Sequence, residues 1–204
     1  MPHDEEEHRI TGPASSLPTS LVLVKHALPV REPAVAPRHW RLGLEGEHQS
    51  RRLASRLLAY APLRLVASPE PKALMTGQLV AAELGLNVSA VAGLEEFDRP
   101  PLPLMPKAEH ERIVAPVFED LQTRVLGAGS GRDALTRFSA AVDTELAQTD
   151  APNLVAITHG TVISLFVSAH NGIDGFELWK RLACPSFVVL DVPSFSVREI
   201  VSGV

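Results

Sequence analysis

The chain has 204 residues, of which 45% are hydrophobic and 21% charged, and its formal net charge is −5. This length and composition suit one well-buried globular domain and argue against a disordered chain. The excess of acidic over basic residues, 24 against 19, argues against a broad nucleic-acid-binding surface, which needs an excess of Lys and Arg. The single cysteine, Cys184, excludes an intrachain disulfide and an all-cysteine metal site.

The N-terminal segment is acidic and lacks the basic and apolar regions of a signal peptide. Residues 1–19 are polar and predict a flexible arm, so the folded domain is expected at residues 20–204. No apolar run approaches the roughly 18 residues that a membrane span needs. We therefore expect a cytoplasmic protein that binds neither membrane nor nucleic acid. No His, Asp and Glu grouping has the spacing of a metal site, and we expect no metal and no cofactor.

Short apolar runs alternate with segments of helical periodicity along the chain. The runs predict strands at residues 20–25, 63–67, 87–91, 153–158, 186–192 and 195–201. The helical segments are predicted at residues 44–59, 71–83, 107–126, 132–148, 161–170 and 174–183. Pro71 suits the first turn of its helix, and Gly85 suits the end of the same helix. The alternation predicts an α/β fold, a three-layer αβα sandwich with a mostly parallel central sheet.

Proline-rich and glycine-rich stretches predict the connections. Residues 27–41 and 98–106 each contain several prolines, which rule out a continuous helix there. The glycine-rich residues 127–131 resemble a nucleotide-binding loop, but they follow a helical pattern rather than a strand. Arg132 also stands where the third glycine of the dinucleotide pattern belongs. We interpret this stretch as a flexible linker between two helices.

Chemically active side chains directly follow the predicted strands. They are His26 after the first strand, Ser68 and Lys72 after the second, Glu95 and Glu96 after the third, and His159 after the fourth. The carboxyl ends of parallel strands meet at one edge of a sheet, where open α/β sheets bind their ligands. Imidazoles, lysines and a carboxylate around one cleft suit phosphoryl transfer. In that reaction a histidine attacks phosphorus, cations hold the equatorial oxygens, and a carboxyl group protonates the leaving oxygen.

Five motifs, in this order, resemble those of the histidine phosphatase superfamily, also called the phosphoglycerate mutase-like family. The family's elements are strand-Arg-His-Gly, Leu-Thr-x-x-Gly-x-x-Gln-Ala, Ser-Pro-x-x-Arg-Ala-x-x-Thr, Leu-x-Glu and strand-x-His-Gly. Their counterparts here are residues 21–27, 42–50, 68–76, 94–96 and 157–163. Each motif alone is a weak signal, but all five in the right order and context are a strong one. The resemblance spans about residues 20–202.

The resemblance implies a role for each catalytic position. His26 is the nucleophile, which forms a phosphohistidine, and His159 contacts the phosphoryl oxygens. Glu96, the third residue of Leu-x-Glu, is the proton donor and later the base that activates water. Its neighbour Glu95 stays open as the alternative proton donor, because the two glutamates are adjacent in the motif.

The chain departs from the family pattern in its phosphate-binding residues. Lys25 and Lys72 stand at the positions of the family's two arginines and, with Ser68 and His159, are expected to bind the phosphoryl group. Arginine grips phosphate oxygens in pairs through a planar fork, whereas lysine is a compact charge on a flexible stem. Ala27 replaces a glycine and adds a Cβ near the expected phosphate site. These changes retain the positive charge but loosen the geometry.

The sequence therefore predicts a phosphatase that hydrolyses a small phosphomonoester through a phosphohistidine. Two alternatives stay open: a catalytically weak or silent phospho-ligand binding protein, and a phosphoglycerate mutase-type phosphotransferase. A homodimer is compatible with the sequence. Residues 29–41 and 98–126 are expected to overhang the cleft and set the substrate. Basic residues there could hold an acidic substrate, although exposure is the simpler explanation for each: Arg31, Arg38, Arg99, Lys107, His110 and Arg112.

Overall fold

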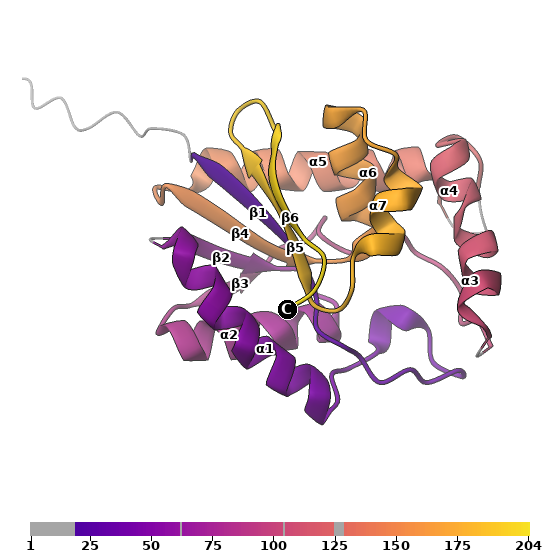
Figure 1. Cartoon of the computed structure of the whole chain (residues 1–204), viewed down its shortest axis with the longest axis horizontal. Coiled ribbons are helices and arrows are strands. Elements are labelled where there is room, and N and C mark those ends of the chain that lie inside the picture. Colours follow the sequence, from indigo (N-terminus) through magenta and orange to yellow (C-terminus); the bar gives the residue numbers. More distant parts are fainter. Residues whose placement is uncertain (1–18, 62, 104, 125–128) are drawn as a thin grey trace, which may run out of the picture.

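The computed structural model describes residues 19–61, 63–103, 105–124 and 129–204. Within them the chain forms a six-stranded sheet with strand order β3-β2-β4-β1-β5-β6 (Figure 1). The strands are β1 (Ser20–Lys25), β2 (Leu63–Ala67), β3 (Val88–Ala90), β4 (Asn153–Thr158), β5 (Ser186–Asp191) and β6 (Val197–Val201). Strands β1 to β4 run parallel, and β5 is antiparallel to both β1 and β6. The mostly parallel sheet is confirmed, whereas the predicted arm lies, apart from Thr19, outside the described residues.

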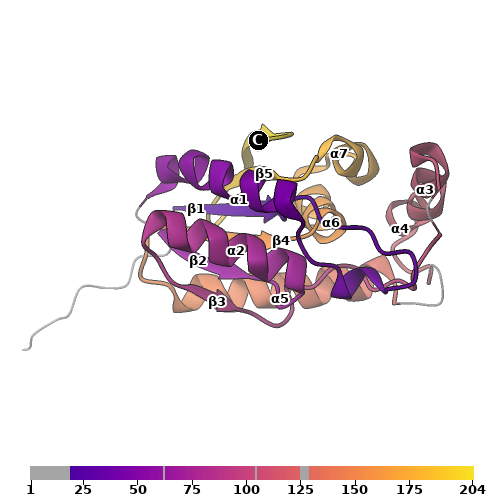
Figure 2. The same cartoon turned by 90° about the horizontal axis from the view of Figure 1, so that it is seen from below.

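Two helical layers cover the sheet because its strands are apolar on both faces. In β1, Leu21 and Leu23 pack into one hydrophobic cluster while Val22 and Val24 pack into another, since successive strand residues point to opposite faces. The cluster of Val22 includes residues of α1 and α2, and the cluster of Leu21 includes residues of α5 and α6 (Figure 2). These helices are α1 (Leu44–Leu57), α2 (Pro71–Leu84), α5 (Gly131–Gln148) and α6 (Gly160–Asn171). The three-layer αβα sandwich is thus confirmed.

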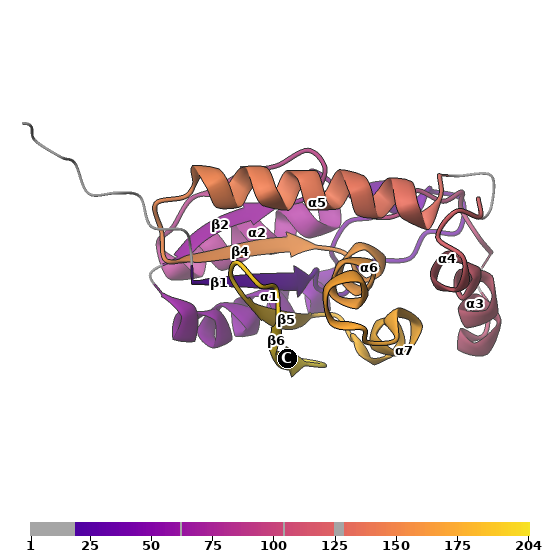
Figure 3. The same ribbon diagram turned by 90° about the horizontal axis from the view of Figure 1, so that it is seen from above.

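Three shorter helices lie beyond the carboxyl ends of β1 and β4 (Figure 3). They are α3 (Lys107–Val114), α4 (Pro116–Glu119) and α7 (Gly175–Arg181). The prediction of one helix over residues 107–126 is wrong, because Pro116 interrupts it and Asp120 ends α4. Proline lacks the N–H of the helical ladder and its ring clashes with the preceding turn. Residues 125–128, which include part of the predicted linker, lie outside the described residues.

The remaining differences from the predicted elements are small. Two 3₁₀ turns, η1 (Pro37–His39) and η2 (Leu58–Tyr60), occupy part of the first proline-rich loop and the end of the first predicted helix. Gly85 ends α2 in the left-handed conformation, as its position predicts. None of the helices in the described ranges is long and apolar enough to cross a membrane.

The register of the sheet brings the ends of three strands together. Lys25 of β1 pairs with Thr158 of β4, and Ala67 of β2 pairs with Ile157 of β4. The ladder extends one residue further, since the His26 N–H donates to the Thr158 carbonyl at 3.0 Å and the Ser68 N–H to the Ile157 carbonyl at 2.8 Å. The sheet therefore places His26, Ser68 and His159 at one edge.

The loop that follows His26 is fixed against α1. A Cβ built on Gly46 would lie only 2.2 Å from the Leu28 carbonyl oxygen, so this helix position requires glycine. The Leu28 N–H also donates to Oε1 of Gln49 at 3.0 Å. Residues of the motif at 42–50 thus fix the position of the loop that follows His26.

Candidate active site

Two buried histidines face each other at the sheet edge. The ring of His26 lies edge-on to the ring of His159, with centroids 5.2 Å apart. His26 is 6% exposed and His159 is completely buried. The expectation that the two imidazoles could reach one small group agrees with this distance.

The hydrogen bond of His26 fixes which ring nitrogen is free. Its Nδ1 lies 2.7 Å from the Ala27 carbonyl oxygen, which can only accept, so Nδ1 carries the proton. Burial lowers the pKa of His26 well below its usual value, and nearby His159 and Lys72 lower it further. The ring is therefore neutral near pH 7, and Nε2 carries a lone pair that can attack an electrophile.

His159 is held by a hydroxyl group and approaches a carboxylate. Its Nε2 lies 2.8 Å from Ser68 Oγ and 3.7 Å from Glu70 Oε1. Its Nδ1 is buried and has no hydrogen-bond partner among the described residues. Burial lowers the pKa of His159 well below its usual value, helped by the charge of Lys72. A buried polar atom without a partner is rare in a folded protein. The other described residues with such an atom are Arg64, Ser164 and Ser186.

Lys72 lies inside the site, but it is not free. Its buried ammonium forms an ion pair with the Glu70 carboxylate and donates to the Pro37 carbonyl at 2.9 Å. Glu70 is only 8% exposed, and its Oε1 accepts from the Glu96 N–H at 2.8 Å. Sequence reasoning missed Glu70, which occupies a variable position of its motif. A glutamate two residues before Lys72 is the only signal that could have indicated it.

Lys25 connects the end of β1 to two other elements. Its ammonium donates to the Leu182 carbonyl, just after α7, at 2.6 Å. Its side chain packs on the first residue of α6, since a Cβ built on Gly160 would lie 3.2 Å from Lys25 Cε. Lys25 therefore lies beside the α6 N-terminus and keeps N–H donors to spare, because an ammonium has three.

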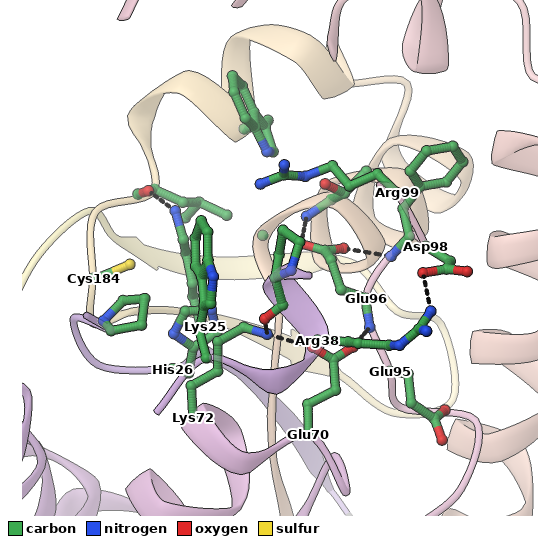
Figure 4. A pocket seen from close by; sticks show the side chains of 18 of the residues that line it. Lys25, His26, Arg38, Glu70, Lys72, Glu95, Glu96, Asp98, Arg99 and Cys184 are labelled. Atoms are coloured by element: carbon green, nitrogen blue, oxygen red, sulfur yellow. Dashed lines mark hydrogen bonds and ion pairs between the residues drawn. The ribbon is translucent and has the colours of Figure 1, made fainter. Parts of the chain in front are cut away.

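The carboxylates of the two adjacent glutamates point in different directions (Figure 4) and have different partners. The Glu96 carboxylate accepts from the backbone N–H groups of Thr161 at 3.1 Å and Val162 at 3.3 Å, in the first turn of α6, and from that of Phe97 at 2.9 Å. Burial raises the pKa of Glu96, although these N–H groups oppose the shift. The Glu95 carboxylate instead binds the Gly93 N–H and Arg137. This placement favours Glu96 over Glu95 as the predicted proton donor.

Arg137 of α5 holds the loop that carries Glu96. Its guanidinium donates to the carbonyl groups of Gly93 at 2.7 Å, Glu95 at 3.0 Å and Glu96 at 3.1 Å, and also to the Glu95 carboxylate. Sequence reasoning missed Arg137. Arg137 lies three residues after Ala134 and four before Ala141, and both alanines are buried. This helical spacing places Arg137 on the same face as the two alanines, which is the signal that could have shown it.

A cavity of about 1160 Å³ opens onto these groups. Lys25, His26, Glu70, Lys72 and Glu96 line it, whereas His159 and Ser68 are not among the described residues on its wall. Of the basic residues predicted to overhang the cleft, Arg31, Arg38, Arg99, Lys107 and His110 line the cavity and Arg112 does not.

Arg31, Arg99 and His110 form a group of neighbouring basic side chains in this cavity. Burial lowers the pKa of His110 to about 4, and the charges of Arg99 and Arg31 contribute. Burial also lowers the pKa of Arg99, which extends from the loop after Glu96 (Figure 4). Across the described ranges, no cluster of three or more His, Cys, Asp or Glu side chains is arranged to hold a metal ion.

Two of the solved structures with a similar fold carry phosphatase names. One is a mycobacterial glucosyl-3-phosphoglycerate phosphatase in complex with VO3, with 19% identity, a TM-score of 0.72, and coverage of 91% of this chain and 100% of that chain. Another is the alpha-ribazole phosphatase from Shigella flexneri, with 15% identity, a TM-score of 0.68, and coverage of 90% of this chain and 96% of that chain. At these identities the likeness shows the fold. No curated protein matches the chain in sequence.

The sequence also matches a family model directly, over residues 33–193. The match begins after His26, so the first motif, in which Lys25 and Ala27 depart from the family pattern, lies outside it. The family is described as the histidine phosphatase superfamily, branch 1. Because the match covers well over half of the residues, the resemblance seen in the five motifs is confirmed, and the chain belongs to this superfamily.

Proposed function

We propose that this protein is a phosphatase that hydrolyses small phosphomonoesters through a phosphohistidine intermediate on His26. The observation that carries the proposal is the hydrogen bond from Nδ1 of His26 to the Ala27 carbonyl. It presents an unprotonated Nε2 in a buried site next to a second imidazole and two lysines. The membership in the superfamily and the phosphatase names of the structural neighbours support the same activity.

In the first step, Nε2 of His26 attacks phosphorus and the bond to the ester oxygen breaks. Glu96 gives its proton to the departing oxygen, so the alcohol leaves neutral. Burial raises the pKa of Glu96, which favours the protonated form that this step needs. In the second step, Glu96 takes a proton from water as the water oxygen attacks phosphorus. The bond to Nε2 then breaks, inorganic phosphate is released, and His26 and Glu96 return to their starting forms.

Lys25, Lys72, Ser68 and His159 hold the phosphoryl oxygens in this proposal. Lys25 has N–H donors to spare, and Nδ1 of His159 lacks a partner within the described residues. Positive and neutral donors fixed in place stabilise the charge that develops on the transferring group. Arg31 and Arg99 further out favour a substrate with a second anionic group, because Arg99 makes no hydrogen bond or ion pair to any described residue.

One observation favours a second candidate, a phospho-ligand binding protein with little or no turnover. Lys72 is already paired with Glu70 and Pro37, which leaves it less free to hold a transferring phosphoryl group. Turnover of p-nitrophenyl phosphate separates the two functions. We expect turnover by the wild-type protein, loss of turnover in His26→Ala, and unchanged turnover in His48→Ala, which removes an exposed histidine of α1. Absence of turnover in the wild type, with phosphate binding retained, would favour the binding protein.

A further inference from the structure

We propose that Glu70 is a built-in anion that occupies the phosphate-binding side of Lys72 and His159, and that a phosphorylated ligand binds by displacing it. The proposal rests on the phosphate pocket of the proposed function. It assigns a role to a residue that the motif leaves variable.

The side chain of Glu70 points into the site and does not cap its own helix. Glu70 is the N-cap residue of α2, yet its carboxylate makes no capping hydrogen bond. The carboxylate instead contacts the Lys72 ammonium, accepts from the Glu96 N–H at 2.8 Å, and places Oε1 3.7 Å from Nε2 of His159. Three groups of the predicted catalytic machinery thus surround one carboxylate.

The number of donors on Lys72 makes Glu70 a competitor for phosphate. An ammonium group has three N–H donors, and the Pro37 carbonyl and the Glu70 carboxylate use two of them. One donor is left for a phosphoryl oxygen while Glu70 stays in place. When Glu70 leaves, a second donor becomes available and the charge of Lys72 is no longer neutralised.

Glu70 connects the cavity wall with His159, since its Oε1 lies 3.7 Å from His159 Nε2. Glu70 and Lys72 line the cavity, but His159 and Ser68 are not among the described wall residues. A phosphoryl group that entered from the cavity and touched both Lys72 and His159 would lie directly against the Glu70 carboxylate. Two anions in contact at a buried site repel strongly, so the phosphoryl group and the carboxylate do not share this position.

Arg99 is placed to receive the displaced carboxylate. It lines the same cavity, and Glu70 is close enough to affect its pKa. Arg99 has no ion pair with a described residue, whereas Arg38 on the same wall is paired with Asp98. With inorganic phosphate, which has no second anionic group to engage Arg99, exchange of the Glu70 partner from Lys72 to Arg99 leaves no charge unpaired.

The test is the affinity for inorganic phosphate, measured by titration calorimetry with the full chain. Glu70→Gln keeps the size and the acceptor for the Glu96 N–H but removes the charge. We expect it to tighten phosphate binding by about tenfold or more, as loss of a like charge in contact implies. The matched control is Asp98→Asn, which removes one charge from the same cavity but has no contact with Lys72. We expect the control to change the affinity less than about threefold.

A double variant tests whether the gain passes through Lys72. In the Lys72→Ala background the released donor is absent but the repulsion between the Glu70 carboxylate and phosphate remains, so Glu70→Gln should still tighten phosphate binding. The difference in gain between the two backgrounds is the part that passes through Lys72. If Lys72→Ala weakens phosphate binding but Glu70→Gln does not tighten it, the displacement proposal is overturned and the phosphate pocket stands. If neither the wild type nor any variant binds phosphate or vanadate, the pocket is wrong and both proposals fail.

A structure of the wild-type protein with vanadate gives an independent check that needs no variant of Glu70. We expect the Lys72 ammonium on the oxyanion and the Glu70 carboxylate moved away from it. Vanadate bound at His26 with the ion pair of Glu70 and Lys72 intact would overturn the proposal.

Discussion

The Glu96 carboxylate accepts hydrogen bonds from the Thr161 and Val162 N–H groups in the first turn of α6, at 3.1 and 3.3 Å. The helix that follows His159 is therefore tied to the loop that follows β3. The N-terminus of a helix favours negative charge, while burial of Glu96 favours its protonated form. These two effects oppose each other in one carboxyl group that the proposed reaction protonates and deprotonates in turn.

The first prediction concerns Lys72. If its ammonium stabilises the transferring phosphoryl group, Lys72→Ala should lose about 2.7–4 kcal/mol of transition-state stabilisation, as for removal of one preorganised donor. Lys72→Arg should be tolerated, because the charge is kept and a two-pronged contact becomes available. The measurement is kcat/KM for p-nitrophenyl phosphate, with Lys180→Ala as the control lysine of the same cavity. An unchanged kcat/KM in Lys72→Ala would remove Lys72 from the site.

The second prediction concerns pH. The nucleophile must be neutral, and the pKa of His26 is lowered well below 6.5. On the acid side, activity should therefore fall only at a pH below the usual pKa of an imidazole. The proton donor must be protonated, and the pKa of Glu96 is raised above 4.5, so activity should fall again as pH rises through that pKa. The profile of kcat/KM should be bell-shaped with an acidic optimum.

Glu96→Gln provides the control for this profile. The alkaline limb should disappear with p-nitrophenyl phosphate, whose leaving group needs little protonation. An alkaline limb that persists unchanged in Glu96→Gln would assign the proton donor elsewhere, and Glu95→Gln would then be the variant to measure.

The third prediction concerns Arg137, which positions the loop of Glu96 through three carbonyl groups. Arg137→Ala should lower the free energy of unfolding by about 1.5–3 kcal/mol, the range for a lost hydrogen bond from a charged group. It should also lower kcat more than it raises KM, because the proton donor is displaced while the phosphate contacts remain. Arg137→Lys should restore only part of kcat, since one ammonium cannot reach all the carbonyl groups. A kcat equal to that of the wild type in Arg137→Ala would limit this residue to a role in stability.

The fourth prediction concerns the substrate. Arg99→Ala should raise KM for phosphomonoesters that carry a second anionic group, by about the 10- to 150-fold that corresponds to the roughly 1.5–3 kcal/mol of a hydrogen bond to a charged group. It should leave KM for p-nitrophenyl phosphate nearly unchanged, since that substrate has no second anion. Equal effects on both kinds of substrate would place Arg99 at the transferring phosphoryl group instead.

The positions of His26, Ser68 and His159 could be predicted from the sequence, because each directly follows a short apolar run and parallel strands align their carboxyl ends. The strands and the principal helices were predictable for the same reason, since their apolar periodicity is local. The helix predicted over residues 107–126 was wrong because its apolar periodicity was given more weight than Pro116, which interrupts the helix.

The contacts of Glu70 and Arg137 could not be predicted in this way. Glu70 is only two residues from Lys72 in the chain, but it meets the backbone of Glu96 only after β2 and the loop beyond β3 are side by side. Arg137 reaches carbonyl groups more than 40 residues away in the chain. The contact of Glu70 with Glu96 and the contacts of Arg137 have no local sequence pattern. The predicted phosphate contact of Lys72 was incomplete because its pairing with Glu70 was missed.

The most direct test of the central claim is trapping of the phosphoenzyme after rapid mixing with a phosphomonoester. The account predicts an acid-labile phosphoryl group on His26, identified by peptide mass spectrometry, and its absence in a folded His26→Ala variant. His48→Ala should be labelled like the wild type. Undiminished acid-labile labelling of His26→Ala, or turnover by that variant at the wild-type rate, would contradict the account.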